Sequence, residues 1–199
     1  MTPILSTVEG SEPYPWPYDG SVPFARLALV ACGWDRAWSG RATGAGAAAE
    51  QVGRLAETVV ALGGHVVAMV HPDQHGDTPD RLPLDGAEVV TTAGIDGFCG
   101  SPLDAVLRRR QVTHLLVVGH GLEAAVHSTM RSANDRGYEC LLVVDACSVL
   151  APELVDRSVS MIHMSGGIFG ATATTAQVLS SVGDHADPTP ASSTIRRFR

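Results

Sequence analysis

Short runs of consecutive apolar residues recur along the chain, each bounded by glycine or polar residues. Such runs are typical of β-strands that are covered on both faces, because a half-exposed strand would alternate apolar and polar positions. The predicted strands are residues 27–31, 65–70, 114–118 and 140–144, with weaker candidates at 88–92 and 168–169. The run at 114–118 is the most apolar and is expected to lie at the centre of a sheet.

Between these runs the apolar residues recur at helical spacing. Val52, Leu55 and Val59 share one helical face, and Gly63 ends that pattern as a glycine at a helix C-terminus does. Helices are predicted at residues 47–62, 103–110, 152–161 and 175–182, and between Gly121 and Gly137. Helices and buried strands therefore alternate along most of the chain.

This alternation predicts an α/β fold with three layers, α/β/α, around a mainly parallel sheet, because parallel strands need crossover connections. In such a sheet, ligands bind beyond the carboxyl ends of the strands. Functional residues are therefore expected at residues 32–35, 119–125 and 145–147, directly after three of the predicted strands.

The chain has 199 residues, of which 45% are hydrophobic and 18% charged, and this suits a single domain with a full core. Residues 1–23 contain the run Pro-Tyr-Pro-Trp-Pro-Tyr, which cannot lie inside a helix, and are expected to form an extended N-terminal arm. The predicted domain comprises residues 24–183. Residues 184–199 are expected to form a flexible tail.

Charge and composition exclude several classes of function. The formal net charge of −7 argues against nucleic-acid binding, which requires clustered cations. No apolar segment has the length of a membrane span and no signal peptide is evident, so we expect a cytoplasmic protein. The four cysteines show no metal-binding spacing, and we expect neither a metal nor another cofactor. All basic residues of the Lys+Arg total are arginine, which excludes any mechanism that needs a lysine.

Four segments resemble one known family. Residues 113–138, THLLVVGHGLEAAVHSTMRSANDRGY, resemble the nucleophile segment of the isochorismatase-like cysteine hydrolases, and residues 140–147, CLLVVDAC, are similar to the strand that follows it. The N-terminal PYPWPYDG and the MSGGIFGA at 164–171 most resemble the branch of biuret and ureidoacrylate amidohydrolases. The resemblance spans residues 13–182 and implies the isochorismatase-like hydrolase fold.

The catalytic positions of that family are changed in this chain. Family members attack amides with a cysteine at a helix N-terminus, assisted by an aspartate and a lysine that favour the thiolate. Aligned on these motifs, Ala125 stands at the cysteine position and Cys32 at the aspartate position. The lysine position falls on or beside Thr92. The resemblance therefore implies a degenerate member that has lost the Asp-Lys-Cys triad.

Other polar residues offer an alternative chemistry. Cys32 and His120 end strands that are neighbours in the family, so a thiol and an imidazole could form a relocated catalytic dyad, with Glu123 or Asp35 orienting the imidazole. Four residues near the same sheet edge are the predicted contacts of a small-molecule ligand: Trp34, His120, Glu123 and Asp145.

Three functions follow from these observations. The favoured hypothesis is a non-catalytic structural or regulatory subunit, in a homo-oligomer or in a hetero-oligomer with an active homologue. The first alternative is a hydrolase or acyl-type enzyme that acts on a small amide-bearing metabolite with Cys32 and His120. The second alternative is a small-molecule binding module that retains the old pocket.

Overall fold

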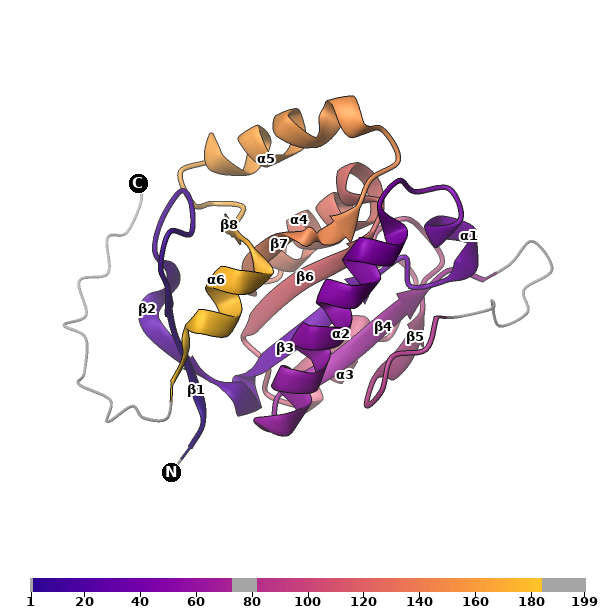
Figure 1. Ribbon diagram of the computed structural model, residues 1–199. Coiled ribbons are helices and arrows are strands. Elements are labelled where there is room, and N and C mark those ends of the chain that lie inside the picture. Colours follow the sequence, from indigo (N-terminus) through magenta and orange to yellow (C-terminus); the bar gives the residue numbers. More distant parts are fainter. Residues whose placement is uncertain (1, 73–81, 184–199) are drawn as a thin grey trace.

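The computed structural model describes residues 2–72 and 82–183. Within these residues, six strands form a parallel sheet in the order β5-β4-β3-β6-β7-β8 (Figure 1). The strands are β3 (Leu27–Cys32), β4 (His65–Val70), β5 (Glu88–Thr91), β6 (His114–His120), β7 (Glu139–Ser148) and β8 (Ala171–Ala173). The predicted α/β fold with a mainly parallel sheet is confirmed.

Helices cover both faces of this sheet, as a parallel sheet requires. On one face lie α2 (Ala45–Ala61) and α6 (Thr175–Ser180), and on the other lie α3 (Leu103–Arg109) and α4 (His127–Asp135) (Figure 1). The short α1 (Arg36–Ser39) follows β3, and α5 (Val155–His163) packs beside β8. The chain thus forms three layers.

Strand β3 shows how the two apolar cores arise. Leu27, Leu29 and Ala31 face a cluster that includes the buried face of α2, which we call the α2-side core. The alternate residues Ala28, Val30 and Cys32 face a cluster that includes α3 and α4, which we call the α4-side core. This alternation follows from the pleat of a strand, in which successive side chains point to opposite faces.

The N-terminal segment, predicted as an extended arm, is extended and also contributes to a second sheet. Strand β1 (Ile4–Val8) pairs antiparallel with β2 (Trp16–Pro23) on one side and with β9 (Val182–Gly183) on the other. The Trp16 side chain is fully buried and meets the edge of the His114 ring, with centroids 5.7 Å apart. These three strands were not predicted, because β1 mixes apolar and polar residues, β2 contains prolines, and β9 has only two residues.

A carboxylate joins this segment to the main sheet. Glu139 Oε1 accepts hydrogen bonds from the Tyr18 backbone N–H at 2.7 Å and from the Tyr14 hydroxyl at 3.2 Å. Glu139 Oε2 lies 3.0 Å from His114 Nε2. Residues of β2, β6 and β7 are therefore held together at the amino ends of the central strands.

Two predicted boundaries were wrong near the C-terminus. Residues 168–169 form part of a turn, and the last strand of the large sheet begins at Ala171. The strand cannot start earlier because Gly170 has a φ of +94° and its backbone packs against Cys140 and Met130. The last helix ends at Ser180, since Val182 already pairs with β1.

No helix in residues 2–72 and 82–183 is long and apolar enough to cross a membrane. The predicted tail, residues 184–199, lies outside the described residues.

Candidate functional site

The carboxyl ends of β3, β6 and β7 lie side by side, because Cys32 is paired with Gly119 and Gly119 with Cys147. Cys32, which the sequence resemblance assigns to the family's aspartate position, is buried in the α4-side core. Burial raises the pKa of the Cys32 thiol to about 12, and the Thr129 hydroxyl offsets this only in part. Burial therefore favours the neutral thiol of Cys32 near neutral pH.

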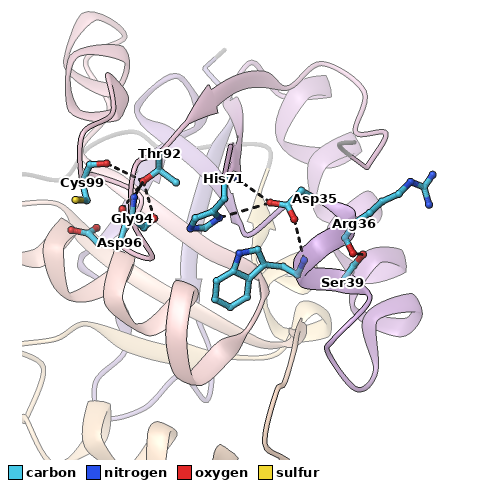
Figure 2. A network of polar contacts seen from close by, with 9 residues as sticks. Asp35, Arg36, Ser39, His71, Thr92, Gly94, Asp96 and Cys99 are labelled. Atoms are coloured by element: carbon cyan, nitrogen blue, oxygen red, sulfur yellow. Dashed lines mark hydrogen bonds and ion pairs between the residues drawn. The ribbon is translucent and has the colours of Figure 1, made fainter. Parts of the chain in front are cut away.

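Thr92, at the lysine position, directly follows β5 and is buried. Its Oγ1 lies 3.0 Å from the Gly94 carbonyl oxygen, 2.8 Å from that of Asp96 and 3.0 Å from that of Cys99 (Figure 2). A hydroxyl has one proton, so it donates to one of these oxygens at a time. Thr92 thus closes its own loop and provides no positive charge to the site.

Ala125, at the nucleophile position, lies in a single π-helical turn, Leu122–Val126, that precedes α4. Its methyl group is buried in the α4-side core, the same core that contains Cys32. The Thr92 loop reaches α4 too, since the Gly97 N–H donates to Thr129 Oγ1 at 2.8 Å. The three residues that the resemblance assigns to the triad therefore converge on one face of the sheet, and none of them is a charged group.

His120 occupies a different environment from Cys32. Its ring stacks on Trp34 with centroids 5.0 Å apart and planes 11° apart, and Trp34 belongs to the α2-side core. His120 Nδ1 lies 2.7 Å from the Ser148 hydroxyl oxygen. Because Cys32 belongs to the α4-side core, the thiol and the imidazole point to opposite faces of the sheet. The predicted Cys32–His120 dyad is not assembled, although their strands are neighbours as expected.

His120 Nε2 and Trp34 Nε1, both buried at this edge, have no hydrogen-bond partner among the described residues. Burial also lowers the pKa of His120, and the nearby Asp35 carboxylate opposes this shift only in part. The histidine is therefore neutral near neutral pH. Of the four predicted ligand contacts, the structure brings Trp34 and His120 together.

Asp35 organises the loop that follows β3. Its Oδ1 accepts the Trp38 N–H at 3.0 Å, which caps α1, and its Oδ2 accepts the His71 N–H at 3.1 Å (Figure 2). Burial alone would raise the pKa of Asp35, but these hydrogen bonds and the His71 imidazole lower it. The carboxylate is thus charged and engaged in local structure.

The other two predicted ligand contacts lie elsewhere. Glu123 accepts a short hydrogen bond from the Ala151 N–H, and its second oxygen has no partner among the described residues. Asp145 is exposed and accepts hydrogen bonds from the Thr175 backbone at 2.7 Å and the Thr175 hydroxyl at 3.0 Å. Asp145 therefore stabilises the start of α6.

Sequence reasoning missed two residues of this edge. His71 directly follows β4 and lies with its Nδ1 3.8 Å from Asp35 Oδ2, and Ser148 ends β7. Both follow apolar runs, which is the signal that would have identified them. In residues 2–72 and 82–183 no group of three His, Cys, Asp or Glu side chains could hold a metal ion.

Comparison with known proteins places this geometry in a family. The model of the isochorismatase domain matches residues 28–177, which begin within β3 and end within α6. The chain belongs to the isochorismatase family.

Relatives of this isochorismatase domain match it over part of their length. The isochorismatase family protein YddQ of Bacillus subtilis is 27% identical over 103 residues, covering 51% of this chain and 57% of YddQ. Ureidoacrylate amidohydrolase RutB of Methylobacterium radiotolerans is 34% identical over 76 residues, covering 38% of this chain and 30% of RutB. The chain thus matches less than two thirds of either relative.

Solved isochorismatase-like structures share the fold. An isochorismatase family protein from Burkholderia thailandensis superposes with a TM-score of 0.68 at 23% identity, covering 79% of this chain and 95% of the other. A nicotinamidase from Staphylococcus aureus gives 0.65 at 15% identity, covering 75% and 98%.

The state of Cys32 in this isochorismatase domain can be measured by alkylation. We expect iodoacetamide to modify the exposed Cys99 rapidly near pH 8 and Cys32 at least about 100-fold more slowly, because few Cys32 thiols are ionised and none is accessible. Peptide mass spectrometry after timed quenching gives both rates. The Cys99→Ser variant is the control and should lack the rapid phase. Similar rates for the two thiols would contradict a buried, neutral Cys32.

The buried His120 should make the domain sensitive to acid. A lowered pKa in the folded state means that the unfolded chain, with a histidine pKa of about 6.5, binds the proton more tightly. Stability is therefore complete above that value and falls as the pH decreases below it. Between about pH 7.5 and about pH 5.5, urea unfolding should show wild type losing about 1 kcal/mol more than His120→Gln. Wild type must be compared with His120→Gln because burial also lowers the pKa of His65 and of His127, which remain in both proteins. Equal losses of stability in wild type and in His120→Gln would contradict the prediction.

Proposed function

We propose that this chain is a non-hydrolytic member of the isochorismatase family that serves as a structural or regulatory subunit of an oligomer, either with itself or with an active homologue. The observation that carries the proposal is the buried methyl group of Ala125 at the position of the family's nucleophile. The short match to a ureidoacrylate amidohydrolase supports descent from the amidohydrolase branch. Reduced cysteines suit a place in the cytoplasm.

The chemistry of the site supports the loss of hydrolysis. Amide hydrolysis by this family's route needs a thiolate, a base and a cation that stabilises charge. The three equivalent positions hold a methyl group, a neutral buried thiol and a hydroxyl that is engaged by carbonyl oxygens. None of these groups supplies a nucleophile or a charge at neutral pH.

An exposed apolar surface supports the role of a subunit. Tyr18, Met164 and Ile168 are all largely exposed. They form one patch, because the Tyr14 ring lies 5.2 Å from that of Tyr18 and packs on Gly167, in the turn that carries Met164 and Ile168. Tyrosine and methionine are enriched in protein interfaces, and a contiguous apolar patch on a surface marks an interaction site.

Native mass spectrometry and an amidase assay test the proposal together. We expect an oligomer of the purified chain, or a complex with an active family member from the same source, and no turnover of ureidoacrylate or nicotinamide. Met164→Glu/Ile168→Glu should dissociate the assembly, whereas Ile95→Glu, at an exposed position outside the patch, should not. A monomer both alone and with the active relative would contradict the subunit role. Turnover that Cys32→Ala abolishes would contradict the loss of hydrolysis.

A small-molecule binding module is the second candidate. It is favoured by the two buried nitrogens without partners, Trp34 Nε1 and His120 Nε2, at the sheet edge where α/β proteins bind ligands. A ligand that bonds to them would raise the melting temperature. A thermal-shift series with small primary amides, on wild type and on His120→Phe, tests this role, and no shift for any amide in wild type would count against it.

A further inference from the structure

A groove of about 430 Å³ lies outside the site described above, between the second half of α2 and residues 83–86. Its floor includes Ala56, Val60 and Leu84, which are apolar. Glu57 and Asp85 stand among these residues and are exposed. The groove therefore combines an apolar floor with two carboxylates.

Neither carboxylate is neutralised by the described part of the chain. Glu57 and Asp85 form no ion pair and no side-chain hydrogen bond within residues 2–72 and 82–183. Arg54 stands three residues before Glu57 on α2, but its guanidinium donates to Gln51 Oε1 at 2.9 Å. The groove thus suits an occupant that joins apolar groups to cations.

The chain itself contains such a segment. Residues 195–199 read Ile-Arg-Arg-Phe-Arg, with three cations and two large apolar side chains in a protein of net charge −7. This segment complements the groove, because its arginines can pair with the carboxylates while its apolar side chain contacts the apolar floor. Charge complementarity therefore favours this segment over a neutral peptide.

The segment can reach the groove. The described chain ends at Gly183, directly after α6, and α6 packs against α2 on the same face of the sheet (Figure 1). Residues 184–194 span up to about 36 Å when extended, more than the length of about 25 Å that the helical rise gives for α2. The intervening residues are thus longer than the helix that forms one wall of the groove, which suits docking within the same molecule.

We propose that residues 195–199 dock in the groove between α2 and residues 83–86 of their own chain. The arginines pair with Glu57 and Asp85, and Phe198 covers the floor at Val60, whose side chain is 45% exposed. The inference is independent of the proposed subunit role.

Limited trypsin digestion of the full chain tests the docking. Trypsin cleaves after Arg197 and releases Phe198 with Arg199, and a docked segment resists this cleavage. We expect Glu57→Gln/Asp85→Asn to accelerate release about fivefold, which corresponds to about 1 kcal/mol, the sum of two exposed ion pairs of typical strength. The matched control is Glu50→Gln, an exposed carboxylate of α2 that does not line the groove. Thermal melts verify that all variants fold.

The outcomes of this digestion distinguish docking within one molecule from docking of a second copy. Faster release in the double variant alone, at a rate that does not change on dilution, supports docking within one molecule. Equal rates in wild type, double variant and control overturn it. Protection that disappears when wild type is diluted also overturns it, because the groove would then hold the segment of a second copy.

Discussion

Replacing Gly119 with alanine is expected to lower the free energy of unfolding by about 4 kcal/mol or more, among the largest effects of a single substitution. Gly119 lies in the buried part of β6, one residue before the strand ends, and has a φ of +124°. A Cβ at this position would collide with the Cys32 carbonyl oxygen and lie 2.6 Å from the Cys32 nitrogen, and both belong to the backbone of a central strand. A backbone atom inside a sheet cannot move aside as a flexible side chain can.

The matched control is Gly137→Ala, at the end of α4. Gly137 also has a positive φ, +85°, but nothing lies within 4 Å of the position where its Cβ would stand. It should therefore cost only the backbone strain, about 1 kcal/mol. Urea unfolding of the two variants measures both values. Similar losses would show that Gly119 is required only for its backbone conformation and not for the close approach of β3.

Replacing Trp16 with alanine is expected to cost about 3 to 5 kcal/mol, the usual loss for a buried aromatic side chain. Trp16 begins β2 and is fully buried in the α2-side core. Its backbone N–H also donates to Ser11 Oγ at 2.9 Å, so the side chain lies in a well-ordered turn. We therefore propose that residues 1–23 contribute to the stability of the domain at 24–183.

Asp19→Ala is the control for this prediction, since Asp19 is an exposed residue of the same strand. It should change the free energy of unfolding by about 0.5 kcal/mol or less. Urea unfolding of the two variants, monitored by far-ultraviolet circular dichroism, measures both losses without relying on tryptophan fluorescence. If Trp16→Ala costs as little as Asp19→Ala, the segment is a dispensable arm.

The elements of the large sheet could be predicted well because their signal is local. His65–Val70 was predicted to the residue, and β3 and β6 to within two residues, since each is an apolar run closed by a polar or glycine residue. Strand β8 was misplaced because its three residues, Ala-Thr-Ala, are no more apolar than the turn before them. Strands β1 and β9 were missed since their pairing joins residues at opposite ends of the chain.

In the candidate site, too, local features could be predicted from the sequence and contacts between distant residues could not. The sequence predicted that β3 and β6 are neighbours, and they are. It could not predict that Cys32 and His120 face opposite cores, because the orientation of His120 depends on the conformation of Gly119 and on the irregular pairing of β6 with β7. The stack on Trp34 and the contact with Ser148 join residues distant in the sequence.

The sequence by itself determined the α/β class, the alternation of strands and helices, and the absence of lysine. These properties follow from residue identity and from periodicity along the chain. Only the tertiary structure decided which core each polar side chain faces, that the N-terminal segment pairs with β9, and that an acidic groove lies beside α2. These depend on packing between distant segments, which local patterns do not encode.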